Sequence, residues 1–269
     1  LMSGGKQAGN HPVPQDEINA MLVRLAREGK RVVRFKGGDP YVFGRGSEEC
    51  EALAEAGVPF EVIPGVTSGV AVPGCIGIPV TCREEAVRLT LITAHESIKS
   101  KGPQISWPCL AKDRHATLVG YMGVSSLPNV SKNLIISGMD PKTPAAIIER
   151  GTTSAQRSVV STLENLPADA EGSGIRPPAL FVIGPTVRHT EALDWMSQRP
   201  LARRRVVMPR SLGGAAEALE LAGAEVVSLP VPARPAARVV VDSLPVDACV
   251  AASGRDVEAW LELGLHDRE

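Results

Sequence analysis

Short helices and strands alternate along the first quarter of the sequence, and this order restricts the chain to few folds. Apolar residues in 15–28 recur at helical spacing, and the segment between Ser47 and Gly57 has a helix's start and stop signals. The runs 31–36 and 60–63 predict strands. A helix–strand–helix–strand order is typical of an α/β domain with a mostly parallel sheet.

Further strands and helices are predicted through the middle of the chain. The segment 99–113 contains Pro103 and Pro108 and is predicted to be irregular. Strands are predicted at 89–93, 116–122, 145–149, 157–161 and 179–183, and helices at 126–137 and 188–195.

A break near residues 198–204, with Pro200 and three consecutive arginines, precedes another α/β segment of about 70 residues. This segment is short for a complete doubly wound domain. Strands are predicted in it at 205–208, 225–229, 238–241 and 248–251, and helices at 213–221 and 256–263.

Composition limits the classes of partner. The chain has 269 residues, with 29 basic and 30 acidic side chains. It therefore has no net positive charge that would attract nucleic acid or an anionic membrane. Aromatic residues make up 3%, which argues against stacking on single-stranded nucleic acid. The five cysteines form no C-x-x-C pair and the histidines are scattered, so reduced thiols in a cytoplasmic protein without a dedicated metal site are expected.

The longest uncharged stretch, 62–82, is not predicted to span a membrane. Its prolines and glycines would leave the backbone of a lipid-exposed helix without hydrogen bonds, so a buried loop, helix and turn are expected. No signal peptide is expected at the start. Because the chain begins with Leu1 rather than Met, it is expected to be an N-terminally truncated form.

Small-residue turns follow the predicted strands. Lys36–Pro40 has two glycines that would let a ligand approach the backbone, although a simple strand-to-helix turn is an alternative. Thr67 and Ser68 either cap the next helix or bind a ligand. Tyr121–Gly123 and Glu149–Thr152 are weaker signals, and Met122 suits a core as well as a site. Such turns at the carboxyl ends of strands favour one shared ligand crevice.

Basic residues accompany these turns and would suit a substrate with several carboxylates. Solvated surface charge is the alternative for each of them. They are Lys6, Arg34, Lys36, Arg45, Arg83, Arg88 and Arg150.

The block from Gly37 to Gly46 reads G-G-D-P-Y-V-F-G-R-G and is the most specific motif in the chain. On this block and the segments given next, about the first 196 residues resemble the uroporphyrinogen-III C-methyltransferases of the tetrapyrrole methylase family. The other matching segments are 5–19, 60–68, 77–81, 93–96 (T-A-H-E, close to T-G-H-E), 149–152 and 178–180.

The resemblance implies a two-lobed α/β fold with S-adenosyl-L-methionine as methyl donor in the cleft between the lobes, S-adenosylhomocysteine being its product. It implies methylation of uroporphyrinogen III at C2 and C7 to precorrin-2, for sirohaem and cobalamin, by a homodimer. Lys6 falls on the family's proton donor. The implied cofactor-binding residues are Gly37, Gly38, Asp39, Val42, Thr67, Ser68, Met122 and Gly151.

Two features depart from the family's pattern. The opening strand, its G-x-G-P-G-D-P turn and an aspartate assigned as proton acceptor would lie upstream of Leu1. The tail resembles the first half of uroporphyrinogen-III synthase, notably in 205–210 and 219–230. The expected domains are a truncated first lobe (1–81), a second lobe (82–197) and a partial synthase-like domain (203–269).

Three other functions stay open. The chain could be a catalytically inactive remnant of a methyltransferase–synthase fusion. The tail could give it a uroporphyrinogen-III synthase role, which would need no S-adenosylmethionine. The chain could also be a related tetrapyrrole methylase that methylates a later precorrin. The intact block from Gly37 to Gly46 argues against this function.

Overall fold

The computed structural model describes residues 13–94, 104–229 and 247–249. The chain divides into two compact units, unit 1 (Leu1–Val70) and unit 2 (Ala71–Glu269). Lys6, the T-A-H-E motif beyond Ala94, and the strand and helix predicted at 238–241 and 256–263 lie outside the described residues.

Unit 1 is built on two helices that pack against each other, α1 (Gln15–Arg27) and α2 (Gly46–Glu55). Ile18, Leu22 and Leu25 lie one turn apart on α1 and are buried. α1 was predicted from this spacing and α2 from its start and stop signals, and both are confirmed to within two residues.

The strands predicted at 31–36 and 60–63 are wrong as stated. Both segments lack strand pairing, and the side chains of Val33, Phe35 and Ile63 are 82%, 88% and 72% exposed. A strand forms only when its backbone groups pair with a neighbour. No neighbouring strand is present among the described residues of unit 1.

Unit 2 contains a five-stranded sheet in the order β1-β2-β5-β3-β4. Among neighbouring strands only β1 and β2 are parallel, and the other pairs are antiparallel. The mostly parallel sheet expected from residues 15–63 is not formed there, because the described residues of unit 1 contain no strand. The short turn after β3 leads straight into its neighbour β4, and so short a connection can join only antiparallel strands. The strands are β1 (Arg88–Thr93), β2 (Ala116–Tyr121), β3 (Pro144–Glu149), β4 (Arg157–Thr162) and β5 (Ala179–Ile183).

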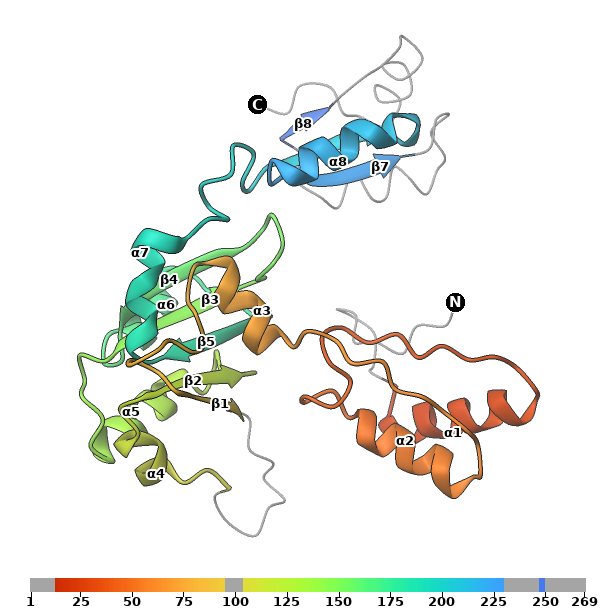
Figure 1. Cartoon of the computed structure of the whole chain (residues 1–269), viewed down its shortest axis with the longest axis horizontal. Coiled ribbons are helices and arrows are strands. Elements are labelled where there is room, and N and C mark those ends of the chain that lie inside the picture. Colours follow the sequence, from red (N-terminus) through yellow and green to blue (C-terminus); the bar gives the residue numbers. More distant parts are fainter. Residues whose placement is uncertain (1–12, 95–103, 230–246, 250–269) are drawn as a thin grey trace. The chain divides into compact units, whose positions relative to one another are not determined.

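Helices cover both faces of this sheet (Figure 1). One face packs against α4 (Trp107–Lys112), α5 (Leu127–Ile136) and α6 (Leu166–Gly172). The other packs against α3 (Ser68–Cys75), whose first residues belong to unit 1, and the 3-10 helix η1 (Pro185–His189). The short helix α7 (Thr190–Leu193) continues from η1.

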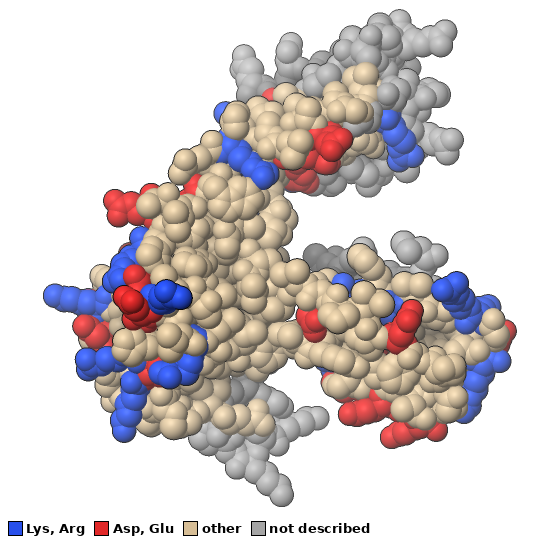
Figure 2. Space-filling view, viewed as in Figure 1, with Lys and Arg blue, Asp and Glu red and all other residues tan. Residues whose placement is uncertain are grey.

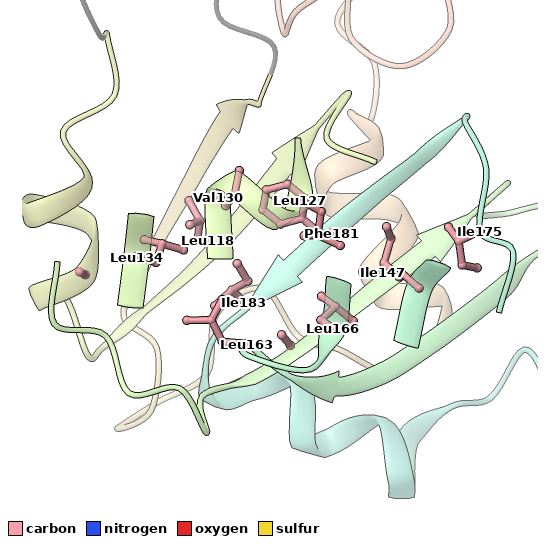
Figure 3. Packing of buried hydrophobic residues seen from close by; sticks show 13 residues of the cluster. Leu118, Leu127, Val130, Leu134, Ile147, Leu163, Leu166, Ile175, Phe181 and Ile183 are labelled. Atoms are coloured by element: carbon pink, nitrogen blue, oxygen red, sulfur yellow. The ribbon is translucent and has the colours of Figure 1, made fainter. Parts of the chain in front are cut away.

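Alternating side chains of the central strands supply the two cores. Phe181 and Ile183 point to the face of α5 and α6, as Figure 3 shows. Leu180 and Val182 belong to the core beneath α3 and η1. This alternation is the period of two that a strand imposes on its side chains.

Two short helices of unit 2 differ from the expectations. α4 lies in the segment predicted to be irregular, because Pro108 occupies its first turn, where the missing N–H costs no hydrogen bond. α6 was not predicted, since a helix of seven residues offers too little periodicity.

The tail forms a β-α-β arrangement, as predicted. The described strands make a parallel sheet in the order β7-β6-β8. Across the described ranges of the chain, no helix is long and apolar enough to cross a bilayer. The elements are β6 (Arg205–Pro209), the 3-10 helix η2 (Arg210–Leu212), α8 (Gly213–Leu221), β7 (Glu225–Leu229) and β8 (Ala248–Cys249).

The contact between Gly120 and Phe181 predicts a stability change. A Cβ on Gly120 would lie 1.9 Å from the ring of the fully buried Phe181. We expect Gly120→Ala to lower the free energy of unfolding by roughly 1–3 kcal/mol, because a packed core resists added volume. Urea denaturation followed by circular dichroism measures the change.

The control is Gly172→Ala at the end of α6, where a Cβ would meet no atom within 4 Å. Alanine favours helix over glycine, so this variant should match or slightly exceed the parent's stability. Equal stabilities for Gly120→Ala and Gly172→Ala would contradict the packing argument.

Candidate functional site

The carboxyl ends of β1, β2 and β3 meet at one edge of the sheet in unit 2. Thr93 pairs with Tyr121, while Tyr121 and Ile148 both lie opposite Leu180 of the intervening strand β5. The turns that begin at Met122 and Arg150 therefore leave the same edge, as the sequence predicted for a shared ligand site.

Strained backbone is concentrated at this edge. Met122, Arg150 and Thr152 have φ values of +54°, +48° and +71°, a region that L-residues rarely adopt. Such residues gather where a structure needs a special backbone shape, often at a ligand site. Met122 is 56% exposed, so the core alternative for it is wrong.

The turn that carries Gly151 is firmly held. The Arg150 N–H donates to the Pro178 carbonyl at 2.9 Å, and the Thr152 N–H donates to Oε1 of the buried Gln156 at 2.8 Å. A Cβ on Gly151 would lie 2.3 Å from the side chain of Val72 on α3. Gly151 is thus required for packing, whether or not it also contacts a ligand.

In unit 1, Asp39 joins the glycine-rich turn to the second loop of the predicted site. Its Oδ1 accepts the Tyr41 N–H at 2.8 Å, and its Oδ2 accepts the Gly65 N–H at 3.1 Å. These backbone hydrogen bonds, first from Gly65 and then from Tyr41, hold the pKa of Asp39 below its usual value. Asp39 is therefore a positioning residue for this loop pair.

The two loops touch through backbone, which explains the glycines. A Cβ on Gly65 would lie 2.1 Å from the Gly38 carbonyl oxygen, so no larger residue fits there. Gly38 has a φ of +73°, the left-handed region that glycine adopts without strain. Sequence analysis did not single out Gly65, although its place directly after a proline in a loop was an available signal.

The remaining predicted residues of unit 1 gather around this contact. The Val42 N–H lies 3.4 Å from the Asp39 carbonyl oxygen, and Gly38 lies against the backbone of Thr67 and Ser68. Ser68 begins α3, and the Thr67 carbonyl accepts the Val70 N–H at 3.0 Å, so both residues shape the helix start. A Cβ on Gly37 would meet no atom within 4 Å, which leaves its backbone open on that side.

Glu49 is a buried carboxylate that sequence analysis missed. It is 4% exposed, and its Oε1 accepts hydrogen bonds from Lys36 at 3.0 Å, Gln15 at 3.1 Å and Arg34 at 3.2 Å. Burial alone would raise the pKa of Glu49, but these hydrogen bonds and positive charges outweigh it and lower the pKa. The available signal was the spacing of Arg34 and Lys36, which puts two cations on one side of an extended segment.

Most of the basic residues proposed to meet a polycarboxylate already have a carboxylate partner. Arg34 and Lys36 pair with Glu49, Arg45 with Glu48, and Arg88 with Asp113. Arg150 is 56% exposed and lies 3.9 Å from Glu149. On the face of unit 2 shown in Figure 2, basic and acidic side chains lie beside one another rather than on separate surfaces. Of the described residues in this set, Arg150 forms the longest pair and lies at the turn after β3, whereas the exposed Arg83 lies before the amino end of β1, at the opposite edge of the sheet.

Each unit therefore has backbone-rich turns of a kind that can bind a small ligand. Each has glycine turns at the ends of extended segments, with the turn geometry fixed by buried or internally bonded side chains. This construction is typical of an α/β protein that binds a nucleotide-like ligand.

The sequence pattern of the family Tetrapyrrole (Corrin/Porphyrin) Methylases matches residues 2–167, and the chain belongs to this family. The expected class of enzyme, a methyltransferase, is confirmed by this membership.

Two curated relatives are siroheme synthases. That of Methylobacillus flagellatus is 43% identical over 200 residues, which cover 74% of this chain and 42% of the relative. That of Thiobacillus denitrificans is 45% identical over 191 residues, which cover 71% of this chain and 39% of the relative. The chain thus spans about two fifths of the length of these relatives.

Solved structures agree with the fold. The uroporphyrin-III C-methyl transferase of Thermus thermophilus, complexed with S-adenosyl homocysteine, is 40% identical with a TM-score of 0.55. That match covers 65% of this chain and 74% of the neighbour. A cobalt precorrin-4 methyltransferase is 27% identical with a TM-score of 0.59, covering 67% of this chain and 73% of the neighbour. The expected mixed α/β tetrapyrrole methylase fold is confirmed.

Glu49 predicts a pH-dependent stability. Its pKa is lower in the folded chain, so its contribution is present above the unfolded value of about 4.3 and is lost as pH falls through the folded value. We expect Glu49→Gln to cost roughly 1.5 kcal/mol or more at pH 7, where charged hydrogen bonds are replaced by neutral ones. The cost should shrink at acidic pH, as measured by urea midpoints across that range.

The control is Glu48→Gln, because Glu48 neighbours Glu49 on α2 but forms an exposed pair with Arg45. Exposed pairs contribute little, so this variant should stay close to the parent at every pH. A pH-independent loss in Glu49→Gln would show that the charge of Glu49 does not matter.

Proposed function

We propose that this chain is an S-adenosyl-L-methionine-dependent C-methyltransferase that acts on uroporphyrinogen III. The proposed reaction methylates C2 and C7 and yields precorrin-2, for sirohaem and cobalamin. The observation that carries the proposal is the Asp39-braced contact between the Gly37–Val42 turn and the Gly65–Ser68 loop. The 40% identity to the Thermus thermophilus C-methyl transferase supports it.

The described residues fit such a cofactor. The backbone of Gly37 is open, and Met122 is exposed at a strained turn, so both loops can offer peptide N–H and C=O groups to a polar ligand. We propose that the cofactor contacts are made by Gly37, Gly38, Asp39, Val42, Thr67, Ser68, Met122 and Gly151.

When bound, the cofactor supplies an activated methyl group for in-line displacement. Reactions of this kind need accurate positioning more than covalent help from the protein. Asp39 gives that positioning in unit 1, because its carboxylate fixes the backbone of Tyr41 and Gly65. In unit 2 the hydrogen bonds of Arg150 and Thr152 hold the turn around Gly151.

Attack by a pyrrole carbon requires a proton to move, which needs an acid or base. We propose Lys6 as the proton donor, on its place in the G-K-Q-A-G motif. Arg150, which lies at the turn that carries Gly151, is proposed to meet a substrate carboxylate.

We propose the three-part organisation 1–81, 82–197 and 203–269 and a cytoplasmic homodimer on the same resemblance. The parallel sheet of β6, β7 and β8 is compatible with the start of a synthase-like domain. A synthase role and an inactive remnant remain the alternatives, and the two experiments below distinguish them.

Cofactor binding is tested by calorimetric titration of the chain with S-adenosylhomocysteine. We expect one site per chain and roughly tenfold weaker binding in Asp39→Ala, because the variant releases two backbone N–H groups of the loop pair. The control is Asp140→Ala, since Asp140 caps a similar turn by accepting the Lys142 N–H at 2.8 Å before β3. Absence of binding in the folded parent would favour the inactive remnant.

Turnover is tested with uroporphyrinogen III and methyl-labelled S-adenosylmethionine. We expect Lys6→Ala to reduce methyl transfer while S-adenosylhomocysteine affinity stays nearly unchanged, because a proton donor acts on the substrate. Lys132→Ala, an exposed lysine of α5, is the control and should match the parent. Loss of cofactor binding in Lys6→Ala would contradict the proton-donor role. Product formation from hydroxymethylbilane without the cofactor would favour the synthase alternative.

A further inference from the structure

Three metal-ligating side chains of unit 2 meet away from the proposed methylation site. The Cys82 thiol, a Glu85 carboxylate oxygen and a His189 ring nitrogen lie within 4.8 Å of one another. Glu85 Oε2 and His189 Nε2 are 3.0 Å apart although 104 positions separate them in sequence. All three residues are half-buried, so they are neither loose surface groups nor sealed in the core.

Both segments that carry these groups are anchored. The backbones of Cys82 and Ala86 exchange hydrogen bonds of 2.9 Å in both directions, and Ala86 is fully buried. On η1, Val187 is fully buried and the Thr186 hydroxyl lies 3.1 Å from that of Thr117 on β2. The donor groups are therefore carried by fixed backbone, as a metal site requires.

The cluster lies at the opposite edge of the sheet from Met122 and Gly151. The loop 82–86 leads into the amino end of β1, and η1 leaves the carboxyl end of the antiparallel strand β5. The methylation site proposed above does not use these residues. Glu84, between two of the donors, has a φ of +70°, a region that L-residues rarely adopt.

Glu85 is prepared to act as a charged ligand. Arg188 pairs with Oε1 of Glu85 at 2.7 Å, and His189 Nε2 lies 3.0 Å from Oε2. Arg188 occupies Oε1, whereas Oε2 faces His189 and is the oxygen counted in the cluster. A cation can replace the hydrogen bond between Oε2 and His189 without displacing Arg188 from Oε1.

We propose that Cys82, Glu85 and His189 form a binding site for one zinc ion. A thiolate, an imidazole nitrogen and a carboxylate oxygen together suit Zn²⁺, whereas Mg²⁺ and Ca²⁺ prefer oxygen ligands alone. Zinc–ligand bonds of about 2.0–2.3 Å put tetrahedral ligands about 3.5 Å apart, so modest side-chain rotation from the observed spacing suffices. Binding releases the thiol proton of Cys82 to solvent, His189 binds as the neutral tautomer with its proton on Nδ1, and water completes the fourth position.

The site would connect the loop before β1 to the helix after β5. Such a link closes a loop of about a hundred residues, and metal links that close long loops constrain the unfolded chain most strongly.

The experiment is a zinc titration of the full chain, free of any purification tag, against a chromophoric chelator. Cobalt substitution follows, because a cysteine ligand gives a thiolate-to-metal absorption band. We expect the parent to bind one more zinc ion per chain than Cys82→Ser or His189→Ala, and to show the band only while Cys82 is present.

The matched controls are Cys109→Ser and His115→Ala, which remove the same residue types at exposed positions of unit 2. Both should keep the parent's zinc stoichiometry and cobalt band. Zinc held by the undescribed residues would bind equally to every variant and so cancel from the comparison.

Protection of Cys82 from iodoacetamide tests the site in the parent alone, which covers the case of a variant that does not fold. Zinc should slow alkylation of Cys82, read by mass spectrometry, and leave Cys109 unaffected. Equal zinc stoichiometry in the parent and in both folded site variants, or unchanged alkylation of Cys82 at saturating zinc, would overturn the proposal. Neither readout depends on methyltransferase activity.

Discussion

Burial of the strands β2, β5 and β3 on both faces is the constraint on which unit 2 depends. Each of these strands sends alternate side chains into two separate cores, with Phe181 and Ile147 on one face and Val182 and Ile148 on the other. Helices must then cover both faces, because either face alone would expose a continuous apolar surface. This arrangement fixes the strand ends, and the strand ends fix where the turns at Met122 and Gly151 emerge.

In both units the carboxylates described below bind other groups of the protein, so they fix the shape of loops rather than present unpaired charge to a ligand. The Asp39 carboxylate accepts hydrogen bonds from two backbone N–H groups. Glu49 forms ion pairs with Arg34 and Lys36, and Glu149 forms one with Arg157. A site constructed in this way presents mostly backbone to its ligand. It suits a cofactor that must be held in one orientation rather than bound by strong ion pairs.

The sequence was a good guide to local structure and to the family. The helices α1, α2, α5 and α8 follow from apolar spacing and their terminal residues, and the five strands of the larger sheet follow from β-branched runs. It was a poor guide where pairing decides the outcome. The runs 31–36 and 60–63 look like strands, yet neither has a hydrogen-bonded neighbour among the described residues. The direction of β5 between β2 and β3 likewise depends on connections that no local pattern encodes.

The sequence by itself determined most of the helical segments, the glycine turns between them, and that the chain belongs to the tetrapyrrole methylase family. These follow from local preferences and from a specific motif, both of which are properties of short stretches. Only the tertiary structure decided that Asp39 binds the loop at Gly65, that Glu49 pairs with two cations, and that Cys82 and His189 meet. Each of these pairs residues far apart in the chain, and such contacts exist only once the backbone has been brought together by packing.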